Sequence, residues 1–193
     1  MKLVALQCPV CNHSLPAGND DLVVACTNCR NAILLDEQGL RPLPVTFAQP
    51  RPGSTPTAWV PVWLFQGQVT LHRRETQGGN AEKEARSFWS QPRYFYIPAW
   101  DITLQSLQQI SLPMLRAQPQ FSPLPAGAIP STPFQPVTVS AEDAQKLTEF
   151  LVLELEVDRQ DWLKSISFDI SLGQPVLWIL PQSQGNLAVD ETG

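Results

Sequence analysis

The four cysteines of the chain carry the clearest chemistry in its sequence, because they form two C-x2-C pairs. The first pair is Cys8 and Cys11 and the second is Cys26 and Cys29, with fourteen residues between the pairs. Each pair can form a tight knuckle that directs two thiolates at one point, and two knuckles together give the tetrahedral sulfur shell that Zn²⁺ favours. The spacing therefore predicts one structural zinc ion held by all four cysteines.

Other interpretations of the cysteines fit the pattern less well. Four unrelated core cysteines are not expected to fall into two such pairs. A shell of four thiolates can also bind iron, but iron knuckles of the rubredoxin type usually carry Gly after the second Cys, where this chain has Asn12 and Arg30. A catalytic zinc needs an open position for water, which four thiolates do not leave. We expect His13 to be a surface residue of the first knuckle rather than a ligand.

The segment around the cysteines resembles the zinc-ribbon superfamily of small β-hairpin modules. A strand-like run at Leu22–Ala25 leads into the second pair, and a second apolar run follows at Ala32–Leu35. Pro9 in the first knuckle and Arg30 after the second also fit the pattern, and the resemblance covers about residues 3–42. It implies a ribbon fold and a bound metal. It does not imply a partner, because ribbons bind nucleic acid in some proteins and other proteins elsewhere.

The rest of the chain shows no arrangement typical of catalysis. Its two histidines are His13 and His72, and the glycine and histidine motifs of phosphate-binding loops and zinc proteases are missing. A group of acidic residues could supply paired carboxylates, but without a metal motif beside it we expect a solvated helix face. Its members are Glu149, Glu154, Glu156, Asp158 and Asp161. We predict that the protein is not an enzyme.

One basic and aromatic cluster lies in the middle of the chain. Its arginines are Arg73, Arg74, Arg86 and Arg93, and aromatic residues alternate with them. Such a cluster can bind single-stranded nucleic acid by phosphate contact and base stacking. The simpler interpretation is that the aromatic residues are core and the arginines border a loop. We retain the four arginines as a candidate contact surface for nucleic acid or a protein partner.

The segment after residue 57 has the signals of a β-rich domain. Ala58–His72 is rich in β-branched and aromatic residues and predicts a long strand, and Tyr94–Ile97 predicts a second one. The polar stretch Arg73–Glu84 is expected to be a loop. Near the C-terminus, Ile166–Leu172 alternates strictly and Val176–Leu180 follows a Gly-Gln turn signal, which predicts a β-hairpin.

Two helices are predicted in the same segment. Asp101 or Thr103 can cap a short helix over 103–112 that Pro113 ends or kinks. Ser140 opens the stronger helix, because it begins a capping-box pattern and apolar residues follow at helical spacing. We expect this apolar stripe to pack on the predicted sheet. Its members are Ala144, Leu147, Phe150, Leu151 and Leu155.

The predicted fold class is α+β, with a small N-terminal zinc ribbon followed by a mixed antiparallel sheet domain with two helices. Five prolines between residues 41 and 57 indicate a semi-rigid linker. The predicted division is a ribbon at 1–42, a linker at 43–57, an α+β domain at 58–183 and a flexible tail at 184–193. We expect the ribbon and the α+β domain to fold as independent units.

Charge and hydropathy limit the function further. The net charge is −5, and residues 94–193 hold four Lys and Arg against eleven Asp and Glu, whereas a general nucleic-acid binder carries a basic surplus. We expect no membrane span, because the sequence has no apolar run of about eighteen residues. The apolar run near the N-terminus is too short for a secretory signal, which predicts a cytoplasmic protein, and four cysteines in such a protein suggest metal binding rather than disulfides.

These observations predict a non-enzymatic zinc-ribbon adaptor or accessory subunit that binds other proteins. The alternative is a nucleic-acid-binding protein that uses the ribbon and the arginine and aromatic cluster.

Overall fold

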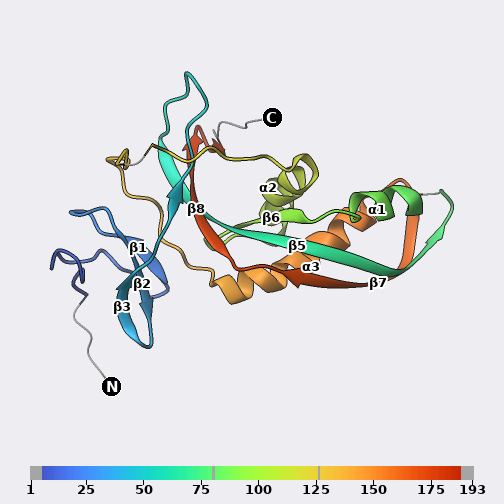
Figure 1. Ribbon diagram of the computed structural model, residues 1–193, viewed down its shortest axis with the longest axis horizontal. Helices are drawn as coiled ribbons and strands as arrows, with labels where there is room; N and C mark the ends of the chain where they lie inside the picture. Colours follow the sequence, from blue (N-terminus) through green and yellow to red (C-terminus); the bar gives the residue numbers. More distant parts are fainter. Residues whose placement is uncertain (1–5, 80, 126, 188–193) are drawn as a thin grey trace.

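The computed structural model describes residues 6–79, 81–125 and 127–187 and has an α+β architecture, as the sequence predicts (Figure 1). It contains one small and one large sheet, with three helices among the described residues. The strands are β1 (Val23–Ala25), β2 (Ala32–Asp36), β3 (Gly39–Pro42), β4 (Thr46–Phe47), β5 (Ala58–Gln77), β6 (Arg93–Pro98), β7 (Trp162–Leu172), β8 (Val176–Ser183) and β9 (Asn186–Leu187). The helices are α1 (Glu82–Phe88), α2 (Leu104–Ala117) and α3 (Ala141–Val157).

The small sheet is an antiparallel β1-β2-β3 meander formed by the cysteine-containing segment. Its two strands β1 and β2 lie where the sequence predicts apolar strands, and β3 extends the sheet by one strand. Because side chains alternate along a strand, the sheet buries two faces. Val24 and Ile33 pack with Cys8 and Cys26 in a core beside the thiols, whereas Val23 faces the main core of the protein.

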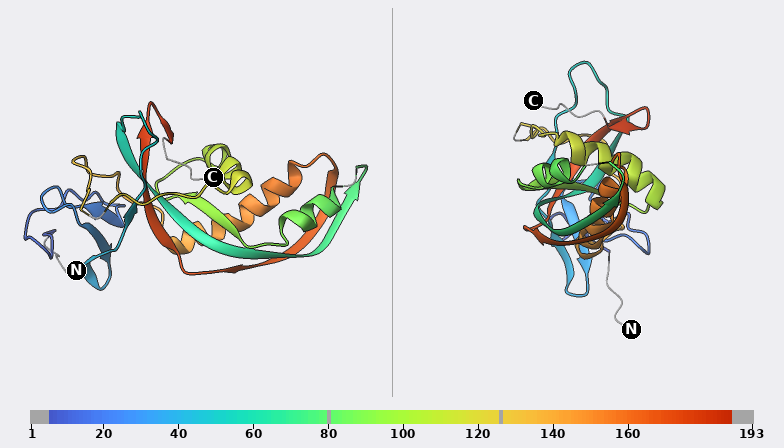
Figure 2. Two further views of the ribbon diagram at one scale, coloured as in Figure 1. Left: turned by 45° about the horizontal axis from the view of Figure 1, so that its top comes forward. Right: turned by 90° about the vertical axis from the view of Figure 1, so that its right-hand side faces the viewer.

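The large sheet is organised around β5, which is longer than the predicted strand because it continues through the segment expected to be a loop. The strand order is β4-β8-β5-β6, and β7 also pairs with β5. The far half of β5 and β7 form a curved two-stranded arm, defined here as residues 67–77 paired with 162–172. Figure 2 shows this arm curving around α1 and α3, which lie on its inner side.

The predicted hairpin between residues 166 and 180 is wrong. Both β7 and β8 pair antiparallel with β5, one after the other, and therefore run in the same direction along it. Leu172 lies opposite Gly67, and Val176 lies opposite Leu64. The three residues 173–175 between β7 and β8 therefore face only two residues of β5, 65 and 66. The Gly-Gln-Pro segment is thus a bulge rather than a turn, and Gly173 N–H donates to the Gln66 carbonyl at 2.8 Å.

Helix α3 begins as the sequence predicts. The Ser140 hydroxyl accepts a hydrogen bond from the Asp143 N–H at 3.0 Å, which caps the first turn. Thr103 caps α2 in the same way, but Pro113 does not end that helix. Pro113 is on the exposed side of α2, where the carbonyl that loses its partner in the preceding turn can bind water.

Helix α1 was not predicted. Two glycines at residues 78 and 79 give the whole stretch the composition of a loop, but β5 extends to Gln77 and α1 begins at Glu82. Glu82 and Arg86 form an ion pair one helical turn apart at 3.0 Å, a spacing that supports helices. That pair is the local signal that sequence analysis missed.

The predicted linker is joined to the large sheet. Within it, β4 pairs in parallel with β8, and Ala48 N–H donates to the Ile179 carbonyl at 2.9 Å. Prolines kept this segment extended without preventing it from forming a short edge strand. At the other end, residues 186–187 of the predicted flexible tail form β9 on β8, and residues 188–193 lie outside the described part of the chain.

The cysteine-containing segment is also attached to the main core. Val23 exchanges backbone hydrogen bonds with Val137, with N···O distances of 2.9 and 3.4 Å. Val23, Ala25 and Ala32 are buried in the same cluster as Trp59 and Phe134. The expectation of two independently folding units is therefore not supported by the packing.

The predicted apolar stripe of α3 packs on the sheet as expected, although two of its members, Leu147 and Phe150, are only partly buried there. Leu151 is fully buried between α3 and the sheet, whereas Phe150 is only partly buried. We expect Leu151→Ala to lower the free energy of unfolding by about 2–5 kcal/mol, because it leaves a cavity in the core. Leu153→Ala, on the exposed side of the same helix, is the control and should cost less than about 1 kcal/mol. Urea denaturation of both variants measures the difference, and equal losses would contradict this packing.

Candidate metal centre and aromatic groove

The four predicted cysteines converge on one point. Their sulfur atoms all lie within 4.8 Å of one another, and the Cys8–Cys29 and Cys11–Cys26 pairs are each 3.6 Å apart. A tetrahedral ion with Zn–S bonds of about 2.3 Å places its sulfurs about 3.8 Å apart, whereas a disulfide needs about 2.05 Å. The cluster therefore fits a metal ion and not a pair of disulfides.

The two knuckles have the same backbone geometry. Asn12 N–H donates to the Cys8 carbonyl at 2.8 Å, and Arg30 N–H donates to the Cys26 carbonyl at 2.9 Å. Asn12 and Arg30 have φ values of 58° and 64°, in the left-handed region that usually favours Gly. Both knuckles thus adopt the turn without Gly, and its geometry brings the two sulfurs of each pair to the same side.

The environment of the thiols differs from one cysteine to the next. Burial raises the pKa of Cys8 to about 11. A hydrogen bond from the side-chain amide of Asn31, at 3.3 Å, is the main cause that lowers the pKa of Cys29 to about 6. A metal binds cysteines as thiolates, so its binding must displace the proton from any cysteine that is still a thiol, such as Cys8. Metal uptake by this cluster should therefore release protons.

The four arginines proposed as a contact surface do not form one patch. Arg74 is buried, while Arg73 pairs with Glu75 and Arg86 pairs with Glu82 at the surface. Arg93 lies over the ring of Phe88, 4.2 Å from its centroid, and donates to the Phe88 carbonyl. Each guanidinium has a partner within the chain, and that of Arg74 is out of reach of an external phosphate.

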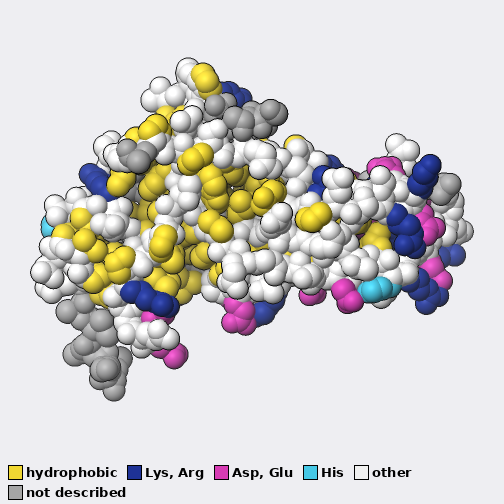
Figure 3. Space-filling view, in the orientation of Figure 1, with side chains coloured by type: hydrophobic (Ala, Val, Ile, Leu, Met, Phe, Trp, Pro, Cys, Tyr) yellow, Lys and Arg dark blue, Asp and Glu magenta, His cyan; other side chains and the backbone are white. Residues whose placement is uncertain are grey.

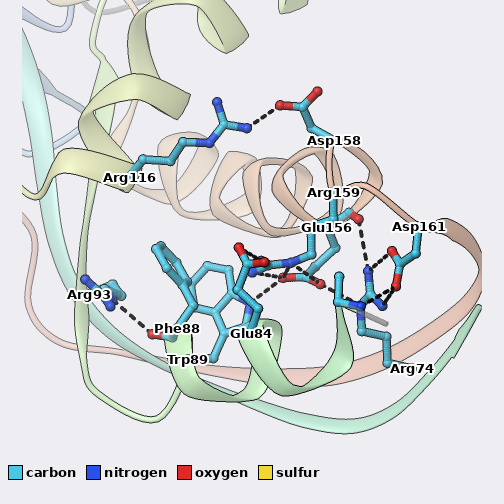
Figure 4. Close-up of polar contacts among 11 residues, drawn as sticks. Arg74, Glu84, Phe88, Trp89, Arg93, Arg116, Glu156, Asp158, Arg159 and Asp161 are labelled. Atoms are coloured by element: carbon cyan, nitrogen blue, oxygen red, sulfur yellow. Dashed lines mark hydrogen bonds and ion pairs between the residues drawn. The ribbon is translucent and has the colours of Figure 1, made fainter. Parts of the chain in front are cut away.

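Arg74 is the centre of a buried ion network, drawn in Figure 4. Its guanidinium donates to Asp161 at 2.6 and 2.7 Å and to Glu156 at 2.8 Å, and all three side chains have 0% exposure. Glu156 also accepts from the Trp89 indole N–H at 2.8 Å and from Arg159 at 2.9 Å. The hydrogen bonds from Arg74 hold the pKa of Asp161 below its usual value.

This network corrects the prediction that the acidic group near 149–161 is a solvated helix face. Glu149 and Asp158 are exposed as expected, but Glu156 and Asp161 are buried partners of Arg74. Every acceptor in the network faces a cation or an N–H group, which is the condition for burying charge. The network joins β5, α1, α3 and the start of β7, so it fixes the arm rather than offering paired carboxylates for chemistry.

The large sheet has a second face with an uncharged groove. Its floor is formed by β5, β6 and β8, and the segment after α2 crosses this face toward β4. The groove has a volume of about 430 Å³, and none of the twelve described residues that line it is charged. Figure 3 shows the same contrast across one side of the molecule, where hydrophobic side chains occupy the centre and left while charged ones gather toward the arm end.

Four aromatic rings form a continuous row along the groove. Tyr94 and Tyr96 have ring centroids 6.5 Å apart, Tyr96 and Phe121 are 5.6 Å apart, and Phe121 and Trp178 are 5.7 Å apart. The two tyrosines come from β6, Phe121 from the crossing segment and Trp178 from β8. Tyr96 is buried beneath the row, whereas the other three rings are partly exposed. Large aromatic rings exposed along a groove are typical of surfaces that bind other molecules. Sequence analysis missed this site because its residues are far apart in the chain.

No protein-family model, curated protein or solved structure matched the chain. Among the described residues, none of the helices is long and apolar enough to cross a membrane. The cluster of four cysteines and the aromatic groove are therefore the features on which a functional argument can rest.

Proposed function

We propose that this protein is a non-enzymatic zinc-ribbon adaptor that binds other proteins in the cytoplasm, and that the groove receives an extended, uncharged segment of the partner. The four cysteines bind one structural zinc ion. This proposal is supported by the closed set of four sulfur ligands, which leaves no position for a substrate. It assigns no reaction to the chain.

The observation that carries the proposal is the row of four aromatic rings in a groove without charged side chains. Protein-binding surfaces are enriched in Tyr, Trp and Phe and depleted of charge at their centres. A surface for single-stranded nucleic acid would combine its aromatic rings with a positive groove. The nucleic-acid alternative has less support, because the four arginines lie elsewhere and have partners within the chain.

Selection of peptides from a random displayed library tests this function. Val176 lies at the edge of the groove with 46% exposure, so that Val176→Glu introduces a charge there with little effect on folding. We expect selected peptides to lose at least tenfold in affinity for this variant. Val157→Glu, which places the same change at a residue of 59% exposure on α3, should bind them as the parent protein does. A failure to select any peptide, or equal binding by both variants, would refute the proposal.

A further inference from the structure

Part of the aromatic row already contacts a proline-containing segment of the chain itself. The hydroxyl of Tyr96 donates to the Pro119 carbonyl at 2.6 Å. Two residues later, the ring of Phe121 packs between Tyr96 and Trp178, with centroids 5.6 and 5.7 Å away. Tyrosine hydroxyls that donate to prolyl carbonyls, with rings packed beside them, are the chemistry of a surface that binds proline-rich segments. The groove continues directly from this internal contact.

The rest of the row has the same groups without partners. Neither the hydroxyl of Tyr94 nor the indole N–H of Trp178 has a hydrogen-bond partner among the described residues. The side chains of Gln66 and Gln174 also line the groove. A polyproline II segment has no internal hydrogen bonds and presents all its carbonyls to the outside. These neutral donors could therefore satisfy its carbonyls while the rings contact its proline side chains.

The absence of charged side chains in the groove also matches an uncharged partner segment. A proline-rich segment without ionised side chains would lose no solvation of charge in this groove, whereas an acidic or basic peptide would have no counter-charge among the residues that line it. We propose that the partner segment is an uncharged, proline-rich peptide in the polyproline II conformation, bound beside Pro119–Phe121 along the Tyr94–Trp178 row. This inference rests on the proposed function and specifies the chemistry of its partner.

Binding of two synthetic decapeptides to the full chain tests the inference. One repeats Pro-Pro-Leu and ends in Pro, with both termini blocked, and the other has Ala in place of each Pro. Calorimetric titration should give saturable binding of the first peptide and at least tenfold weaker binding of the second, because only the first is preorganised as polyproline II. Equal binding of the two peptides would overturn the inference.

Variants that remove single donors locate the site. Trp178→Phe and Tyr94→Phe keep a ring but lose the N–H or O–H group, and each should weaken binding of the proline peptide about fivefold, the usual effect of one neutral hydrogen bond. Trp162→Phe is the matched control, because Trp162 lies at the end of the arm with 76% exposure. Unchanged binding by the first two variants, or an equal loss in the control, would overturn the assignment.

The outcomes also separate this inference from the function on which it rests. If displayed peptides without proline bind in a manner that Val176→Glu abolishes, while the proline peptide does not bind, the inference is wrong and the proposed function stands. If neither the library nor the proline peptide yields binding, both are wrong.

Discussion

Replacing Arg74 by Met is expected to lower the free energy of unfolding by about 3–5 kcal/mol, while the same change at its neighbour Arg73 costs less than about 1 kcal/mol. The two costs differ because the side chain of Arg74 is buried and that of Arg73 is exposed. Loss of the Arg74 guanidinium leaves the carboxylates of Glu156 and Asp161 buried without their main partner, and an uncompensated buried charge is strongly destabilising. Arg73 makes a surface pair with Glu75, and such pairs contribute little.

Guanidinium denaturation of the two variants measures these costs. The pair is closely matched, because both residues lie on β5 and both belong to the arginine cluster identified in the sequence. If Arg74 were instead a contact for nucleic acid or a protein partner, its loss would reduce binding and leave stability intact. A small and equal effect of the two substitutions would therefore contradict the buried network.

Removal of the metal is expected to destabilise the whole chain and not only the ribbon. The cysteine-containing segment has only a small core of its own, and small segments of this kind generally depend on their metal to fold. When it unfolds, Val23 leaves the main core and loses its backbone hydrogen bonds to Val137. Burial of one Val and two or three hydrogen bonds together amount to about 3–5 kcal/mol. For a chain of this size, that corresponds to a decrease in melting temperature of roughly 10 °C.

Chelation followed by thermal unfolding, with near-ultraviolet circular dichroism of the tryptophans, measures this effect. Cys26→Ser should show the lowered melting temperature without chelator, and chelator should then cause no further change. All six tryptophans lie outside the ribbon, so they report on the α+β domain. An unchanged tryptophan signal and melting temperature would show that the ribbon and this domain are independent.

The convergence of the four cysteines and the start of α3 could be predicted because their signals are local. Two C-x2-C pairs define the ligands by spacing alone, and a Ser followed by apolar residues at helical spacing defines a helix start. The geometry agrees at both places: the sulfurs converge, and Ser140 caps α3. Asn12 and Arg30, which directly follow the second cysteine of each pair, have the left-handed backbone conformation that the knuckle requires at that position.

The rest of the site depends on contacts between distant parts of the chain. Arg74 is 82 residues from Glu156 and 87 from Asp161, so no local pattern distinguishes these carboxylates from exposed ones. The Gly-Gln-Pro segment before Val176 has the composition of a turn, and only the length of β5 makes it a bulge between two collinear strands. The groove likewise combines rings from two strands and a proline-rich segment.

X-ray absorption at the metal edge of the purified protein tests most directly that the metal centre is structural and closed. We expect one zinc ion per chain with four sulfur neighbours at about 2.3 Å and no nitrogen or oxygen neighbour. Loss of any of Cys8, Cys11, Cys26 or Cys29 should change that shell. Iron in the site, or an oxygen or nitrogen ligand at about 2.0–2.1 Å in the parent protein, would contradict a closed structural zinc site.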